Sequence, residues 1–155
     1  MSILAIDPGT DRSAVVQWDG EKIKYAQIVD NIVLLWDLRF KHNAPYVAIE
    51  WIESYGMPVG KEVFVTCRWC GRFEEAAVDS GSVYYVTRKQ VKSHHCHSTR
   101  ATDANVRQAL IDRFGPPGTV KTPGLTYGLK KDLWSAFALA TYWYDTNNQK
   151  TKGNP

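Results

Sequence analysis

The sequence of 155 residues predicts a single domain of the α/β class. Three observations predict it. Five short apolar stretches have the length and composition of β-strands, and stretches with helical spacing separate the later ones. The first three strands follow one another closely, as in an antiparallel meander. Apolar residues make up 44% of the chain, which is enough to form one hydrophobic core.

The first half of the chain is expected to form three strands and a helix. The strands cover residues 2–6, 13–18 and 22–29. Asp19-Gly20 predicts a hairpin turn between the second and third strands, because this dipeptide tolerates the positive φ angles of such turns. The helix covers residues 30–43, where apolar side chains recur at helical spacing and Asp30 or Asn31 can cap the first turn.

The second half adds two strands and four helices. Strands are expected over residues 46–49 and 82–87, and helices over 61–77, 88–97 and from Asp103 to a stop at Gly115. The last helix, over residues 130–144, is apolar nearly all round and should be buried. Residues 146–155 are polar and are expected to form a flexible tail, so the domain itself covers residues 1–145.

The charge and the cysteine content exclude several classes of protein. The formal net charge is only +3, so binding to nucleic acid requires a local basic surface. Residues 88–100 are rich in Arg, Lys and His, and this density favours phosphate contacts over an ordinary solvated face. No apolar run approaches the roughly 18 residues of a membrane helix, no signal-peptide pattern opens the sequence, and an odd number of cysteines argues against a disulfide framework. We therefore expect a soluble cytoplasmic protein with no membrane partner.

Two of the predicted strands end on a carboxylate, and a third acid begins the last helix. Asp7 follows the first strand and Glu50 follows the fourth. If these strands are parallel neighbours, about 4.8 Å apart, the two carboxylates meet at one edge of the sheet. Asp132 lies in the first turn of the buried last helix, where an unpaired charge is costly. Taken singly, Asp7 could be a turn residue and Asp132 a partner of the helix dipole.

Such a cluster of carboxylates would attract a hard divalent cation. Mg²⁺ prefers carboxylate oxygens together with water and phosphate as ligands. A pair of these ions can clamp the attacking and leaving oxygens of a phosphodiester during hydrolysis. The three acids therefore predict a metal-dependent reaction on a phosphate group.

Five segments, in order along the chain, carry a resemblance to a known family: "LAIDPGT" (4–10), "VAIEWIESYGMPVGKEVF" (47–64), "TRKQVK" (87–92), "TDANVRQALIDRFG" (102–115) and "GLKKDLWSAFALA" (128–140). Together they resemble RuvC-type Holliday junction resolvases of the RNase H-like superfamily, and more closely the versions carried by phages and prophages. The resemblance implies a mixed five-stranded sheet flanked by helices, a homodimer, and paired symmetric nicks in a four-way DNA junction. It also implies Mg²⁺ as cofactor, with Mn²⁺ able to substitute, and 5′-phosphate and 3′-hydroxyl ends.

The resemblance assigns roles to individual residues of this sequence. Asp7 would bridge two metal ions, Glu50 would bind one of them and Asp132 the other. Ser135 stands where the family often has a second acid or a histidine on the last helix. Either three carboxylates suffice with more water ligands, or another acid completes the site, and the candidates for it are Asp11, Glu53 and Asp103.

The same resemblance indicates which basic residues contact DNA. Lys92 matches a lysine that holds DNA in the family. Ala104 replaces a second such lysine, so Arg100 or Arg107 could take over that role, and Lys131 could contact phosphate. With the basic run after the fifth strand, the predicted DNA-contacting residues are Arg88, Lys89, Lys92, Arg100, Arg107 and Lys131.

Other patterns in the chain have a structural and a functional interpretation. Cys67-x-x-Cys70 followed by His94-His95-Cys96-His97 has ligand types of a zinc site, but both members of the first pair fall inside a predicted helix. Free cysteines there behave as small apolar residues, so zinc is not expected. Trp51, Tyr55 and Met57 belong either to the core or to a surface that stacks on unpaired bases. The helix over 61–77 has two apolar faces, and one of them could be a dimer interface.

Three other functions compete with junction cleavage. A nuclease of the same fold could instead cut RNA in RNA–DNA hybrids, and a catalytically silent DNA-binding module would carry the same basic surface. A nucleotide-binding fold of the actin/Hsp70 type also opens with an "I-D-x-G-T" pattern, but it requires more than twice this length.

Overall fold

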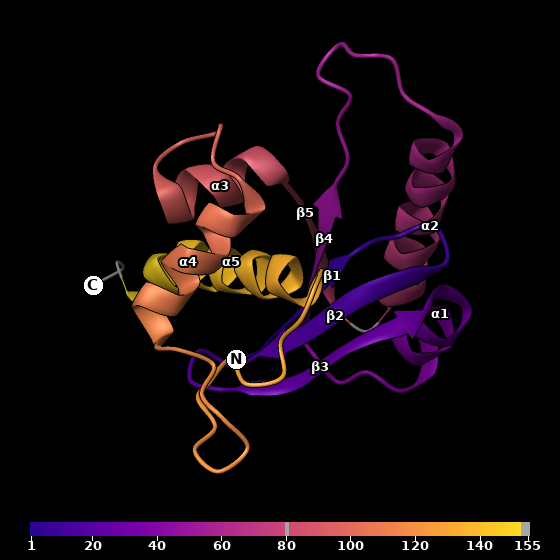
Figure 1. Ribbon diagram of the computed structural model, residues 1–155. Coiled ribbons are helices and arrows are strands. Elements are labelled where there is room, and N and C mark those ends of the chain that lie inside the picture. Colours follow the sequence, from indigo (N-terminus) through magenta and orange to yellow (C-terminus); the bar gives the residue numbers. More distant parts are fainter. Residues whose placement is uncertain (80, 153–155) are drawn as a thin grey trace.

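The computed structural model describes residues 1–79 and 81–152. A five-stranded sheet lies at its centre, with helices on both faces (Figure 1). The strands are β1 (Ile3–Asp7), β2 (Arg12–Trp18), β3 (Ile23–Asp30), β4 (Tyr46–Trp51) and β5 (Ser82–Thr87). Their order is β3-β2-β1-β4-β5, with β1–β2 and β2–β3 antiparallel and β1–β4 and β4–β5 parallel. The predicted mixed α/β sheet, with its antiparallel meander first, is therefore confirmed.

Five helices cover the two faces of this sheet. They are α1 (Asn31–Phe40), α2 (Lys61–Ala77), α3 (Arg88–Cys96), α4 (Asp103–Phe114) and α5 (Leu133–Lys152). α1 and α2 pack on one face and α3, α4 and α5 lie on the other (Figure 1). Within the described ranges, no helix combines the length and apolarity needed to span a bilayer.

Alternation along β1 and β4 divides the core into two layers. Ile3 and Ala5 of β1 and Ala48 of β4 pack towards α5, whereas Ile6 of β1 and Ile49 of β4 pack towards α1 and α2. Side chains two positions apart share a face of a strand. The residue that follows each strand's apolar run therefore projects on the α5 face of the sheet.

The last helix is buried through its first half, as its apolar sequence predicts. Ala136, Phe137 and Ala140 are fully enclosed, and the helix packs across β1 and β2. It continues past residue 144, where the sequence pattern predicts its end. The Thr146 hydroxyl donates to the Tyr142 carbonyl at 2.9 Å, so the predicted flexible tail of residues 146–155 begins as helix. Residues 153–155 of that tail lie outside the described residues.

Side-chain caps fix the start of the two helices that border the site. The Thr87 hydroxyl accepts a hydrogen bond from the Gln90 amide at the start of α3, and the Gln90 side-chain oxygen accepts one from the Thr87 amide. Thr102 and Asn105 form the same reciprocal pair at the start of α4. Such capping boxes satisfy amide groups that the first helical turn leaves unpaired. At α1, Asp30 occupies the cap position but makes no side-chain hydrogen bond to the helix, and its carboxylate instead lies 3.3 Å from Arg12 Nε.

Candidate active site

Asp7 and Glu50 lie next to each other at one edge of the sheet. β1 and β4 are parallel neighbours, and their register pairs Ile6 with Ile49, so the next residue on each strand is one of the two acids. Both continue the side-chain alternation that points Ala5 and Ala48 towards α5. The sequence predicts that the two carboxylates meet if their strands are parallel neighbours, and the structure pairs β1 and β4 in this way.

Asp132 joins this pair from the start of α5, although not from inside the helix. The sequence pattern places it in the first turn, whereas α5 begins at Leu133. The Asp132 carbonyl accepts the Ala136 amide at 3.0 Å, so Asp132 occupies the position just before the first helical residue. Lys131 precedes it with a φ of 49°, a left-handed conformation that turns the chain into the helix.

The electrostatics of Asp7 show that these acids act on one another. Burial raises the pKa of Asp7 well above its ordinary value, and the Glu50 carboxylate raises it further. Asp132 and Asp103 act in the same direction, and Arg88 opposes them. A buried carboxylate among other carboxylates is stabilised by any cation that can reach it.

A cleft of about 340 Å³ opens beside these carboxylates, between α3, α4 and the start of α5. Three acids line it, namely Glu50, Asp103 and Asp132. Four of the six predicted DNA-contacting residues line it as well, namely Arg88, Lys92, Arg107 and Lys131. The cleft therefore places cationic side chains around a group of acids, as a site for a phosphate and a metal ion would require.

Arg88 contacts two of the acids that line this cleft. Its Nε donates to Glu50 Oε1 at 2.9 Å, and its Nη1 donates to Asp103 Oδ2 at 3.4 Å. Burial alone would lower the pKa of Arg88, but Glu50, together with Asp7 and Asp103, raises it above its ordinary value. Lys92 makes a longer contact, with its Nζ 3.9 Å from Asp103 Oδ1. Arg88 is thus engaged with the acids of the site, which the sequence pattern alone does not indicate.

The other predicted DNA-contacting residues occupy different environments. Lys89 places its Nζ 3.7 Å from the centre of the Tyr55 ring, and Arg107 places its guanidinium 4.9 Å from the Trp134 ring. Arg100 is exposed in the turn before α4 and is absent from the lining of the cleft. Lys89 and Arg100 could therefore contact DNA only outside the cleft.

The donor set at the cleft fits a hard divalent cation, although it is not assembled as a metal site. Within residues 1–79 and 81–152, no group of three or more His, Cys, Asp or Glu side chains is arranged to hold a metal ion. Asp7, Glu50 and Asp132 offer carboxylate oxygens, which Mg²⁺ prefers, and one oxygen of Glu50 already accepts from Arg88. Their role as metal ligands stays a prediction.

Of the acids considered as a fourth ligand, only Asp103 lines the cleft. Asp11 and Glu53 are exposed and do not line it. Ser135 does line the cleft and is half-buried there. Asp103 is therefore the acid best placed to complement the first three.

The two halves of the zinc-like pattern lie on opposite faces of the sheet. Cys70 is buried in the layer under α2, whereas Cys96 packs against the layer under α5. His94 and His95 have other partners, Asp145 Oδ2 at 2.8 Å and the Ala138 carbonyl at 2.9 Å. The cysteine pair and the histidine segment therefore do not form one zinc site.

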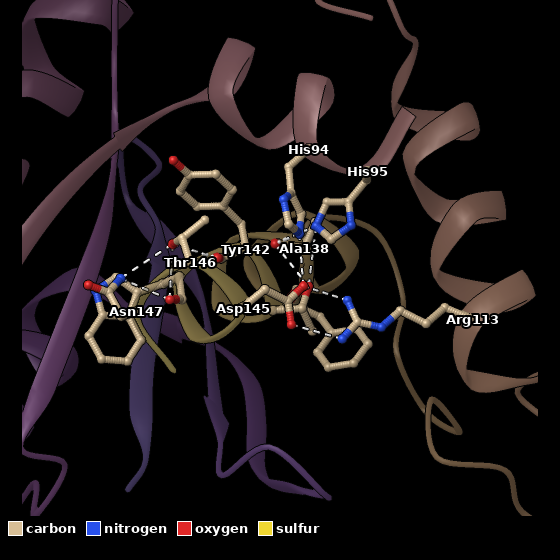
Figure 2. A network of polar contacts seen from close by, with 11 residues as sticks. His94, His95, Arg113, Ala138, Tyr142, Asp145, Thr146 and Asn147 are labelled. Atoms are coloured by element: carbon tan, nitrogen blue, oxygen red, sulfur yellow. Dashed lines mark hydrogen bonds and ion pairs between the residues drawn. The ribbon is translucent and has the colours of Figure 1, made fainter. Parts of the chain in front are cut away.

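Two polar networks that position the site have no signal in the sequence pattern. In the first, Asp145 of α5 accepts two bonds from Arg113 of α4, at 2.6 and 2.8 Å, and also contacts His94 of α3 (Figure 2). This network joins three helices, two of which carry the basic residues of the cleft. Its members lie 32 and 51 positions apart, so no local motif reveals them.

The second network holds the loop that follows Asp7. The buried Ser13 hydroxyl donates to Asn31 Oδ1 at 2.6 Å and accepts the Gly9 amide at 3.2 Å. Asn31 Nδ2 donates to the Gly9 carbonyl at 2.9 Å, so both backbone groups of Gly9 are fixed. The conformation of the chain just after Asp7 is thereby set by two buried polar side chains.

Comparison with known proteins supports the fold. The sequence matches no protein-family model and no curated protein. Thermus thermophilus RuvC has 17% identity and a TM-score of 0.70 over 96% of this chain and 97% of its own. The same protein in complex with a Holliday junction substrate has 18% identity and a TM-score of 0.73 over 97% of each chain. The yeast mitochondrial Holliday junction resolvase Ydc2 has 12% identity and a TM-score of 0.62 over 97% of this chain and 80% of its own.

These likenesses cover nearly the whole chain. They show that it has the fold of RuvC, an RNase H-like fold, and confirm at that level the resemblance drawn from the sequence. The phage or prophage origin that the sequence suggests stays a prediction.

Proposed function

We propose that this chain is a structure-selective DNA endonuclease that resolves four-way or otherwise branched DNA by paired symmetric nicks. The observation that carries the proposal is the meeting of Asp7 and Glu50 at the ends of parallel strands, beside Asp132 and a cleft lined by basic residues. Supporting it, the fold is shared with a RuvC whose structure contains a Holliday junction substrate.

The proposed chemistry is hydrolysis of one phosphodiester in each of two strands. Asp7, Glu50 and Asp132 would hold Mg²⁺, for which Mn²⁺ could substitute. When bound, divalent ions activate a water molecule and neutralise charge on the phosphate. Lys92 and Lys131, which both line the cleft, would position the strand through its phosphates. The products would carry 5′-phosphate and 3′-hydroxyl ends.

Paired nicks require two active sites, and the exposed apolar side chains of α1 and α2 support a homodimer. Trp36 and Phe40 of α1 are 60% and 65% exposed, and Phe64 of α2 is 66% exposed. Both helices lie on the face of the sheet opposite α5, and they pack against each other. A surface of this kind is suited to association with a second copy of the chain.

The loop after β4 supports contact with unpaired bases at a junction centre. Trp51, Tyr55 and Met57 are all exposed, so the interpretation of these residues as core is wrong. Trp51 packs edge-on against Tyr85, with ring centres 4.8 Å apart. Exposed aromatic side chains are typical of surfaces that stack on single-stranded bases.

Cleavage of matched synthetic substrates tests the proposal. A four-way junction, a linear duplex and an RNA–DNA hybrid, all of one sequence, are incubated with the protein and Mg²⁺, and the nicks are mapped. We expect paired nicks in opposed strands of the junction and no cutting of the duplex. Preferential cutting of the RNA strand in the hybrid would instead assign the chain to hybrid-directed ribonucleases.

A second candidate, a non-catalytic DNA-binding module, is favoured by one contact. Arg88 already occupies Glu50, and Ser135 supplies no carboxylate. Tight junction binding with no cleavage in Mg²⁺ or Mn²⁺ would support this alternative. It would also remove the assignment of Asp7, Glu50 and Asp132 as catalytic residues.

A further inference from the structure

Arg88 is held at Glu50 by the architecture of the sheet. β5 pairs with β4 in parallel, and the register places Val86 opposite Glu50. Arg88 follows two positions after Val86, as the first residue of α3, and α3 is fixed there by the Thr87–Gln90 capping box. The guanidinium therefore reaches Glu50 from a rigid strand-to-helix junction.

The contact uses an oxygen that a metal ion would need. Glu50 is 13% exposed, and its Oε1 accepts the Arg88 Nε at 2.9 Å. A divalent cation binds carboxylate oxygens at about 2.0–2.6 Å. A guanidinium and a divalent ion sharing one carboxylate also repel each other at short range. The two cations therefore compete for Glu50.

Asp103 offers Arg88 an alternative partner. Arg88 Nη1 already lies 3.4 Å from Asp103 Oδ2, and Asp103 is exposed and lines the cleft. A small rotation of the guanidinium would exchange Glu50 for Asp103 or for a phosphate entering the cleft. The same cation also acts on Asp7, so its departure would leave both acids in need of positive charge.

We propose that Arg88 is a positioning residue that occupies the place of a divalent cation at Glu50 and must release Glu50 before metal binds. This inference rests on the proposed function only in taking Glu50 as a metal ligand. A DNA phosphate that draws Arg88 away from Glu50 would raise the affinity for metal, and bound metal would raise the affinity for DNA by the same factor. The site would then assemble fully only on its substrate.

Calorimetric titration of the DNA-free protein with Mn²⁺ tests the competition directly. Arg88→Gln removes the competing charge, and we expect its affinity for Mn²⁺ to exceed that of the unmodified protein about tenfold or more. Arg88→Lys keeps the charge and should stay close to the unmodified protein. Arg39→Gln makes the same change of charge at an exposed ion pair with Glu75, on the other face of the sheet, and should have no effect.

Each outcome of this titration decides the matter. An unchanged affinity in Arg88→Gln would show that the guanidinium does not compete. A weaker affinity would show that Arg88 builds the metal site, and either result overturns the proposal. If neither protein bound Mn²⁺, the metal site and with it the proposed function would fall. If the unmodified protein cleaved junctions but Arg88→Gln bound Mn²⁺ no more tightly, this inference alone would be overturned.

A measurement on the unmodified protein removes any dependence on how the variants fold. The Arg88 Nε–H proton is bonded to Glu50 and should exchange slowly with water in the absence of metal. Addition of Mg²⁺ should accelerate this exchange, with the midpoint of the change at the calorimetric dissociation constant. Metal binding without any change at this proton would contradict the proposal.

Discussion

His94 of α3 contacts Asp145 of α5 through its Nε2, 2.8 Å from Oδ2 (Figure 2). Arg113 of α4 binds both oxygens of the same carboxylate, so one acid near the end of the chain joins three helices. Two of these helices carry Arg88, Lys92 and Arg107 to the cleft. The stability of the helical layer and the shape of the cleft therefore depend on one carboxylate far from the reacting groups.

Asp145→Asn should destabilise the fold by about 1–3 kcal/mol, because it removes the negative charge that binds Arg113 and replaces one of the two acceptor oxygens with an amide group that cannot accept. Chemical denaturation at neutral pH measures the loss. Asp37→Asn is the matched control, since Asp37 pairs with Lys41, one helical turn away at the end of α1, and such pairs are worth about 0.3–0.5 kcal/mol. Equal losses in the two variants would show that the network adds nothing to an ordinary surface pair.

The same carboxylate predicts a pH dependence. Burial alone would raise the pKa of Asp145, but its bonds with Arg113 and His94 outweigh burial and lower it. A carboxyl group whose pKa is lower in the folded than in the unfolded state stabilises the fold above its unfolded pKa, and this contribution is lost as the pH falls through the folded pKa. The difference in unfolding free energy between the unmodified protein and Asp145→Asn should therefore shrink below about pH 4. A constant difference from pH 7 to pH 3 would contradict the prediction.

Asp7→Asn should abolish cleavage while junction binding survives. The substitution removes a metal-binding oxygen but leaves the basic residues of the cleft in place. It also removes a charge that is buried beside Glu50, so the metal-free protein should be at least as stable as before. Nick mapping and a junction-binding assay measure the first two effects, and thermal unfolding measures the third. Cleavage at the normal rate would show that Asp7 is not a metal ligand.

The elements that the sequence predicts well are those with a local signal. Continuous apolar runs mark β1 and β4, and the acids that follow these runs, Asp7 and Glu50, could be placed together once a parallel pairing was assumed. The sequence pattern predicts that the last helix begins at residue 130, whereas α5 begins at Leu133. The apolar run does not reveal that Lys131 turns the chain with a positive φ. The contact between Arg88 and Glu50 could not be foreseen, because it depends on the pairing of β5 with β4 across 38 positions.

Lys92→Ala should weaken junction binding and make it less dependent on salt. Lys92 lines the cleft and its nearest acid, Asp103, is 3.9 Å away, so its charge is available to a phosphate. Loss of one phosphate contact should reduce the slope of log K against log salt concentration by about 0.9. Lys41→Ala, on α1 at the other face of the sheet, is the control and should leave the slope unchanged. If Lys92→Ala had the same slope as the unmodified protein, Lys92 would not contact a DNA phosphate.

Ser13→Ala should lower both stability and activity. The substitution leaves Asn31 Oδ1 and the Gly9 amide without their buried partner, which should cost about 1–3 kcal/mol. Release of the loop after Asp7 should also slow cleavage. Thr66→Ala is a suitable control, because the Thr66 hydroxyl bonds only the Glu62 carbonyl within its own helix. A cost no larger than that of Thr66→Ala would show that the Ser13–Asn31 pair does not fix the loop.

Trp36→Glu should convert a dimer into a monomer. The Trp36 and Phe40 rings pack 5.1 Å apart on the exposed side of α1, and a charge placed there would be buried unpaired in any association through this surface. Sedimentation should give the mass of two chains for the unmodified protein and of one chain for the variant.

The effect of this change on cleavage separates assembly from catalysis. A monomer that keeps its cleft should still nick a junction strand but should lose the coordinated second nick, so nicked junctions accumulate and resolved duplexes decline. Val120→Glu makes the same kind of substitution at an exposed apolar side chain in the loop between α4 and α5 and should leave mass and products unchanged. A dimer that persists in Trp36→Glu would place the subunit interface away from α1.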